Sequence, residues 1–138
     1  MSLNSVEGAR VPRFLLAFSS LLLVVGGYMH AAAFKRAVAA VDASNLPSFF
    51  GNSLKLLWLG DSTTMFILVA VFTLIAARPS AVTSPVVMLL ALIPAATAVL
   101  LYAFLGSFFA GHLLLAVAAL VFFAGLRFAQ AAAQINKG

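Results

Sequence analysis

Four apolar stretches, each long enough to cross a bilayer as a helix, dominate the sequence. They cover residues 13–34, 54–77, 85–105 and 107–127. About 20 apolar residues in a helix cross the roughly 30 Å of hydrocarbon in a bilayer, and a chain in hydrocarbon must pair its own backbone polar groups. The sequence therefore predicts an all-α integral membrane protein. We expect one transmembrane domain over residues 1–138, an up-down-up-down bundle of four transmembrane helices.

The composition argues against a soluble domain. Hydrophobic residues make up 64% of the 138 residues and charged residues 8%, whereas an ordinary soluble domain is about 45–50% apolar. A soluble domain of this length leaves much of its surface exposed to water and could not hide so much apolar area. The chain contains no cysteine, which excludes disulfides, thiolate metal sites and thiol nucleophiles.

Local signals mark the helix ends. Pro12 suits a first helical position, where its missing N–H costs nothing. The basic start, the apolar middle and the "HAAA" that follows also fit a signal peptide, but we expect this segment to be retained as the first span. The second stretch ends at Arg78, and Ser84 is a cap for the third. Pro94 lies in the middle of that third span and predicts a kink.

The segment between the first two spans is too patterned for a disordered linker. We expect the first helix to extend as far as Val41. Ser44 or Asn45 then gives a cap signal, and Pro47 lies near a new helix start. The sequence thus predicts a short interfacial helix within an outer loop of about residues 35–53. Four residues would face lipid around it: Phe49, Phe50, Leu54 and Trp58.

The basic residues predict the orientation. Five fall on one side of the predicted bilayer: Arg10, Arg13, Arg78, Arg127 and Lys137. Three fall on the other side: Lys35, Arg36 and Lys55. Because basic residues favour the cytoplasmic side, we expect the cell inner membrane with both termini in the cytoplasm. The basic residues form no cluster despite the net charge of +5, so no nucleic-acid partner is expected.

Three ionisable residues lie inside the apolar runs, at one predicted depth. His30, Asp61 and His112 each come out roughly 5–10 Å below the outer boundary at 1.5 Å per residue. Thr64 and Tyr102 lie near the same level, as do Asn52, Ser62 and Thr63. Ionisable groups in a membrane are costly and commonly functional. We therefore take His30, Asp61, His112, Thr64 and Tyr102 as a candidate polar site of unknown catalytic role.

Asp61 has two interpretations. It could cap a helix, since a carboxylate satisfies first-turn N–H groups. A helix starting there would have only about 16 residues before Arg78, which is short for a span. A longer helix from Leu54 buries Asp61, which then needs a partner such as His30, His112 or Lys55. The length favours the longer helix, with His112 as the first candidate partner and His30 as the next.

The two histidines and Asp61 also have other interpretations. His30 can be a neutral histidine that donates to a helix carbonyl, and His112 should face the bundle rather than lipid. Two imidazoles and a carboxylate are a known ligand set for zinc or iron, so His30, Asp61 and His112 are also candidate metal ligands. No HExxH or ExxH spacing supports such a site, and no cofactor is predicted.

The sequence carries no catalytic signature. It lacks GxSxG, Walker A and GxGxxG motifs, so a non-enzymatic role is favoured. We expect a small inner-membrane protein of bacterial type that binds a hydrophobic ligand or acts as an accessory subunit of a membrane complex. Its expected partners are membrane lipids, and it could form a homo-oligomer or join a larger complex. The alternatives are a proton- or cation-handling site, acid–base chemistry on a lipidic substrate, and a structural subunit whose polar groups join helices.

In length and number of spans, the chain resembles the small multidrug resistance transporters. These are four-helix proteins that work as dimers, with a central carboxylate in the middle of the first helix. Here the first span, "FLLAFSSLLLVVGGYM", has no acidic residue. The resemblance is one of outline, and no function follows from it.

Overall fold

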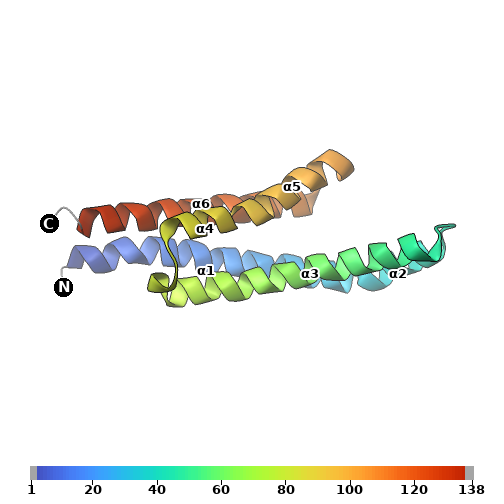
Figure 1. The fold of residues 1–138 in the computed structure, drawn as a ribbon, viewed down its shortest axis with the longest axis horizontal. Helices are drawn as coiled ribbons and strands as arrows, with labels where there is room; N and C mark the ends of the chain where they lie inside the picture. The colour runs from blue at the N-terminus through green and yellow to red at the C-terminus, as the bar shows by residue number, and fades with distance from the viewer. Residues whose placement is uncertain (1–2, 136–138) are drawn as a thin grey trace.

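Every regular element in residues 3–135, the part of the chain that this computed structural model describes, is a helix (Figure 1). The elements are α1 (Leu3–Ala32), α2 (Phe34–Asp42), α3 (Ser48–Ala77), the 3-10 turn η1 (Pro79–Ala81), α4 (Ser84–Leu90), α5 (Leu92–Leu105) and α6 (Phe109–Ile135). The predicted all-α class is thus confirmed.

Four helical stretches are long and apolar enough to cross a membrane, as the sequence predicts. They are Arg10–Asp42, Ser48–Ala77, Ser84–Leu105 and Phe109–Gln134. The first combines α1 with α2, and the third combines α4 with α5. Each predicted span falls almost entirely within one of these stretches, because apolar length alone determines where such a helix can lie.

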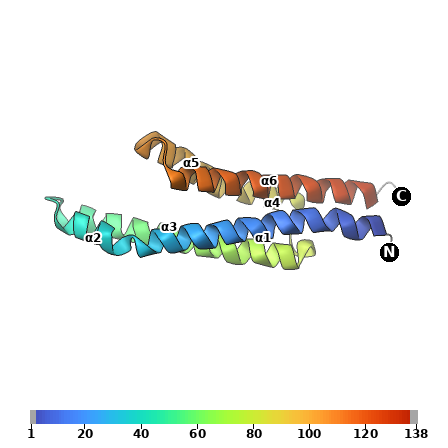
Figure 2. The same cartoon turned by 180° about the vertical axis from the view of Figure 1, so that it is seen from behind.

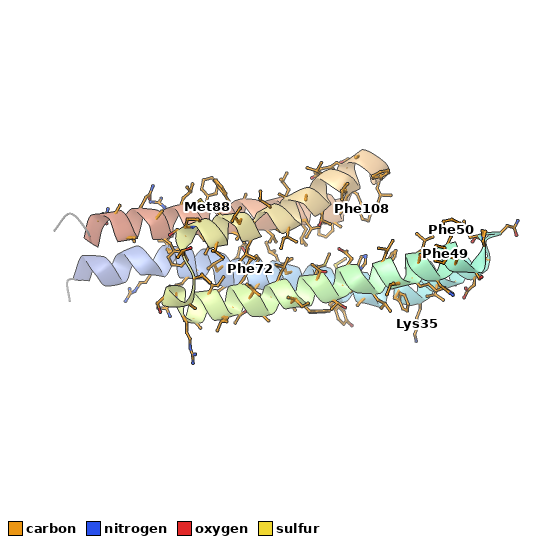
Figure 3. All side chains as sticks on the ribbon, in the orientation of Figure 1. Lys35, Phe49, Phe50, Phe72, Met88 and Phe108 are labelled. Atoms are coloured by element: carbon orange, nitrogen blue, oxygen red, sulfur yellow. The ribbon has the colours of Figure 1, made fainter. Side chains whose placement is uncertain are left out.

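The helices pack around α1. Helix α3 lies along one side of α1 and α6 lies along another, while α4 and α5 pack on α6 (Figures 1 and 2). The two ends of the chain lie at the same end of the molecule. The buried core includes Leu16 and Leu23 of α1, Phe72 of α3 and Val117 of α6. Figure 3 shows Phe72 in this core, between the lower and the upper pair of helices.

Small residues let α1 and α3 approach closely, as expected for helices that pack in a membrane. Ser19 and Ser20 are buried on α1. The Ser20 hydroxyl donates to the Leu16 carbonyl at 3.0 Å and accepts from the Thr73 hydroxyl of α3 at 3.3 Å. These serines are part of the packing between helices.

The predicted short interfacial helix is not a separate element. Helix α2 follows α1 after the single turn residue Ala33, and residues 43–47 are not helical. Helix α3 then begins at Ser48 and continues without a break, because no proline follows Pro47 until the helix has ended. Ser44 does not cap this helix. Its hydroxyl donates to the Val41 carbonyl at 2.6 Å, at the end of α2.

The kink predicted at Pro94 is present as a break between α4 and α5. Pro94 has no N–H to donate to the Leu90 carbonyl one turn earlier, and the helix is interrupted at Ala91, between these two residues. The Ala91 N–H bonds to the Met88 carbonyl three residues back, at 3.2 Å. Beyond the break, α5 bends away from α1 and α3 (Figure 1).

The two pairs of helices differ in length. Helix α2 and the first turns of α3 project past the turn between α5 and α6 (Figures 1 and 2). We call α2, together with the part of α3 before Trp58, the two-helix extension. It is held by an ion pair between Lys55 and Asp42 and by contact between Gly51 and Val41, where a methyl group in place of the glycine hydrogen would lie 3.1 Å from a Val41 methyl. Its base adjoins Trp58 and Asp61 of α3.

Candidate functional site

A cavity of about 430 Å³ lies where α5 and α6 separate from α1 and α3. Its volume is within the range of ligand pockets, about 300–1,000 Å³. One wall is apolar and comes from Leu101 and Leu105 of α5, from Phe108 in the turn, and from Phe109 and Leu113 of α6. Figure 3 shows Phe108 at this end of α5 and α6. The break at Ala91 bends α5 outward, which leaves room for the cavity.

The opposite wall carries the polar groups. The His30 Nε2 atom lies 3.6 Å from Asp61 Oδ2, and its Nδ1 atom lies 2.9 Å from the Ser62 hydroxyl. The imidazole stacks on the indole of Trp58, with ring centroids 4.4 Å apart and planes 15° from parallel. The indole N–H donates to the His30 carbonyl at 2.9 Å. His30 therefore meets three side chains of α3 at once.

The spacing of these residues on α3 explains the arrangement. Trp58, Asp61 and Ser62 stand at positions i, i+3 and i+4, which lie on one face of a helix. That face meets α1 at His30. Asp61 lies well inside α3 rather than at its start, so the interpretation of Asp61 as a cap is wrong and the longer helix is confirmed. The helix begins even earlier than the predicted Leu54, at Ser48.

The Ser62 hydroxyl lets His30 change protonation state without losing a partner. This hydroxyl has one proton and lies 2.9 Å from His30 Nδ1 and 3.2 Å from the Trp58 carbonyl. With a neutral imidazole, the hydroxyl donates to Nδ1 and the ring's N–H at Nε2 faces Asp61. With a protonated imidazole, Nδ1–H donates to the hydroxyl, which turns to the Trp58 carbonyl. The N–H at Nε2 faces the carboxylate in both states.

His112 belongs to a different contact. Its Nδ1 atom bonds to the Tyr102 hydroxyl, and its Nε2 atom lies 3.5 Å from the Ser107 hydroxyl. Gly111 makes room for the Tyr102 ring, since an added methyl group would lie 3.0 Å from it. These contacts join α5 to α6. Neither His112 nor Tyr102 is among the residues that line the cavity.

The structure thus divides the five predicted site residues into three sets. His30 and Asp61 meet on the cavity wall, so the partner of Asp61 is His30 rather than His112. Tyr102 and His112 pair with each other. Thr64 is exposed and its hydroxyl donates within α3, to the Gly60 carbonyl at 2.9 Å.

Sequence reasoning missed the position of Trp58. Trp58 was expected to face lipid, yet it is half-buried and stacked on His30. The spacing Trp58–Asp61–Ser62 on one helix face was the available signal, because a tryptophan N–H near a membrane boundary needs an acceptor. The sequence predicts Ser62 near the level of His30, but their contact could not be read from the sequence.

The three candidate metal ligands do not converge. Within the part of the chain that the structure describes, no group of three histidine, cysteine, aspartate or glutamate side chains is placed to hold a metal ion. His30 and Asp61 lie together, but His112 faces Tyr102. What the wall offers is therefore one acid–base pair beside an apolar space.

Comparison with known proteins gives no relative. No family model matches the chain, and no curated protein and no solved structure is significantly similar to it. Function must be inferred from the cavity and its polar wall. An apolar cavity with one acid–base pair can bind an apolar molecule and present it with a charge or a proton.

Proposed function

We propose that this protein is an integral membrane protein that binds a hydrophobic small molecule in the cavity between α1, α3, α5 and α6. In the proposed topology the four apolar stretches cross the inner membrane up-down-up-down, with both termini in the cytoplasm. The protein acts alone or as an accessory subunit of a larger membrane complex, and the ligand enters from the surrounding lipid.

The cavity is the observation that carries the proposal. The space of about 430 Å³ is open to the surroundings, because its lining includes the exposed side chains of Leu105, Phe108 and Phe109. Its volume lies within the range of ligand pockets. Apolar walls of this kind gain little from water, whereas an apolar ligand would cover them.

Ala110→Phe tests ligand binding, because Ala110 lines the cavity and a benzyl side chain there would occupy part of it. The matched control is Ala116→Phe, the same change at an exposed position of α6 outside the cavity. Trp58, the one tryptophan of the chain, reports on the cavity through its emission. We expect neopentylbenzene to change this emission saturably in the parent protein and in Ala116→Phe. Ala110→Phe should weaken binding at least about tenfold, or 1.4 kcal/mol.

The proposal fails if all three proteins give the same response, because the probe would then be reporting its solubility in lipid. Native mass spectrometry of the same three samples shows whether a ligand co-purifies. A bound species retained by Ala110→Phe as strongly as by Ala116→Phe would also count against the cavity.

A second candidate function is proton handling by His30 and Asp61. The observation that favours it is the Ser62 hydroxyl. This hydroxyl can donate a hydrogen bond to the neutral imidazole of His30 or accept one from the protonated imidazole. Histidine changes charge near physiological pH, and a carboxylate beside it can share the proton. Proton uptake into vesicles that requires His30 would distinguish this function from ligand binding alone.

A further inference from the structure

We propose that the ligand of this cavity carries an ammonium group, which Asp61 holds at the polar wall. This inference rests on the proposed ligand-binding function and specifies its substrate class. Such a ligand is an amphiphile with one positive charge and an apolar body. The group could come from the headgroup of a membrane lipid or from a free lipophilic amine.

Charge is the first observation that supports a cation. Among the described residues that line the cavity, Asp61 is the one acid, and none is a lysine or an arginine. The basic side chain nearest in sequence, Lys55, is paired with Asp42 in the two-helix extension. When His30 is neutral, its Nε2–H faces the carboxylate at 3.6 Å but supplies no countercharge, and the carboxylate borders an apolar space. A charge in such surroundings is costly unless it is paired, and an ammonium group would pair it.

The aromatic side chains of the cavity are the second observation. Trp58 lies beside Asp61 on one wall, and Phe108 and Phe109 lie on the other. Aromatic rings attract cations through the negative charge on their faces, and more strongly away from water. A carboxylate with aromatic neighbours therefore discriminates between a quaternary ammonium group and an uncharged group of the same shape.

The position of the cavity is the third observation. Its lining joins the polar wall, which begins at Trp58 where the two-helix extension ends, to Leu105 and Phe108 at the turn between α5 and α6. The stretch Ser84–Leu105 has 22 residues and is about 33 Å long, close to the hydrocarbon thickness. In the proposed topology this turn lies at a membrane boundary. An amphiphile there would place its charged head at Asp61 and its apolar body against α5 and α6.

Two probes of equal shape test the inference. Benzyltrimethylammonium and neopentylbenzene differ in one atom, a charged nitrogen in place of carbon. They are titrated against Trp58 emission in nanodiscs of phosphatidylglycerol, which contain no ammonium lipid. We expect the parent protein to bind the cation about tenfold or more tightly than its neutral counterpart, a difference of 1.4 kcal/mol. Asp61→Asn should lose this preference and keep its affinity for neopentylbenzene.

Asp42→Asn is the matched control, because it removes a carboxylate that lies outside the cavity. It should retain the preference, and it corrects for attraction of the cation to the lipid surface. Equal binding of both probes by the parent protein would overturn the inference, as would a preference that survives in Asp61→Asn. If Asp61→Asn does not fold, the affinities of the two probes are compared in the parent protein and in Asp61→Glu, which keeps the charge.

The outcomes separate this inference from the proposed function. If neopentylbenzene binds and Ala110→Phe prevents it, but the cation has no advantage, ligand binding stands and the ammonium inference fails. If neither probe binds, the proposed function fails as well. Nanodiscs with added phosphatidylethanolamine identify the source. If phosphatidylethanolamine lowers the affinity of the protein for benzyltrimethylammonium, a lipid headgroup is supported as the ligand. If this affinity does not change, a free amine is supported.

Discussion

His30 is the residue on which the polar wall depends. Its ring contacts Trp58, Asp61 and Ser62, and its carbonyl accepts the indole N–H. One residue of α1 thus fixes the orientation of three side chains of α3. His112 offers a natural comparison, because it is also a histidine of an apolar helix but bonds to Tyr102 outside the cavity lining.

The paired variants His30→Gln and His112→Gln test the proton-handling function. A glutamine can keep a hydrogen bond but cannot take up a proton near neutral pH. For this function we expect vesicles containing the protein, with a pH-sensitive dye inside, to acidify after an external acid pulse faster than empty vesicles. His30→Gln should return the rate to that of empty vesicles, and His112→Gln should leave it unchanged. A parent protein that matches empty vesicles would rule out proton handling.

At the scale of elements, close contact between α4 and α6 depends on a glycine. A methyl group added to Gly125 would lie 2.6 Å from Met88 Cγ, 3.2 Å from the Met88 backbone nitrogen and 3.3 Å from the Ser84 carbonyl oxygen. The backbone atoms cannot move aside as a flexible side chain can. Gly60 of α3 is the opposite case, since nothing lies within 4 Å of an added methyl group.

We therefore expect Gly125→Ala and Gly60→Ala to change stability in opposite directions. Gly125→Ala should lower the free energy of unfolding by roughly 1–3 kcal/mol, because it overpacks the contact. Gly60→Ala should raise it by up to about 1 kcal/mol, because alanine favours a helix over glycine. Circular dichroism during denaturation in mild detergent measures both. Destabilisation by Gly60→Ala, or none by Gly125→Ala, would contradict the packing described.

The helices could be predicted from the sequence because each depends on local information. Apolar length located four membrane-length stretches, Pro94 predicted the break in the third, and span length placed Asp61 inside α3. The end of the predicted short interfacial helix, which starts near Pro47, was harder to predict. Pro47 and the polar residues before it indicated a helix start, but nothing local shows that this helix continues to Ala77.

Contacts between helices could not be predicted in the same way. A soluble helix shows its buried face by the spacing of its apolar residues, but a helix in lipid is apolar on nearly all sides. Many large side chains of α3, such as Leu56, Leu57 and Ile67, are exposed although they are as apolar as the buried ones. Depth along the helix placed His30, Asp61 and His112 at one level. Only the rotation of each helix determines that His30, not His112, meets Asp61.

At the scale of the whole molecule, the connections between the helices allow a direct test of the proposed topology. The chain has no cysteine, so single cysteines can be added without removing any. Ser80→Cys lies in η1 and Asn45→Cys lies between α2 and α3, both at exposed positions. We expect a membrane-impermeant maleimide to label Asn45→Cys in intact cells and Ser80→Cys in inside-out vesicles. The reverse pattern would overturn the orientation, and labelling of both from one side would overturn the topology.

In the proposed topology, the unequal lengths of the two helix pairs have a consequence for the surrounding lipid. The stretch Arg10–Asp42 has 33 residues and Ser84–Leu105 has 22, which correspond to about 50 Å and about 33 Å. The extra length is α2, which carries the charged residues Lys35, Arg36 and Asp42. The two-helix extension therefore reaches past the hydrocarbon and carries exposed apolar side chains such as Phe49 and Phe50 into the headgroups. Lipid packing is disturbed most on the side of the molecule where the cavity lies.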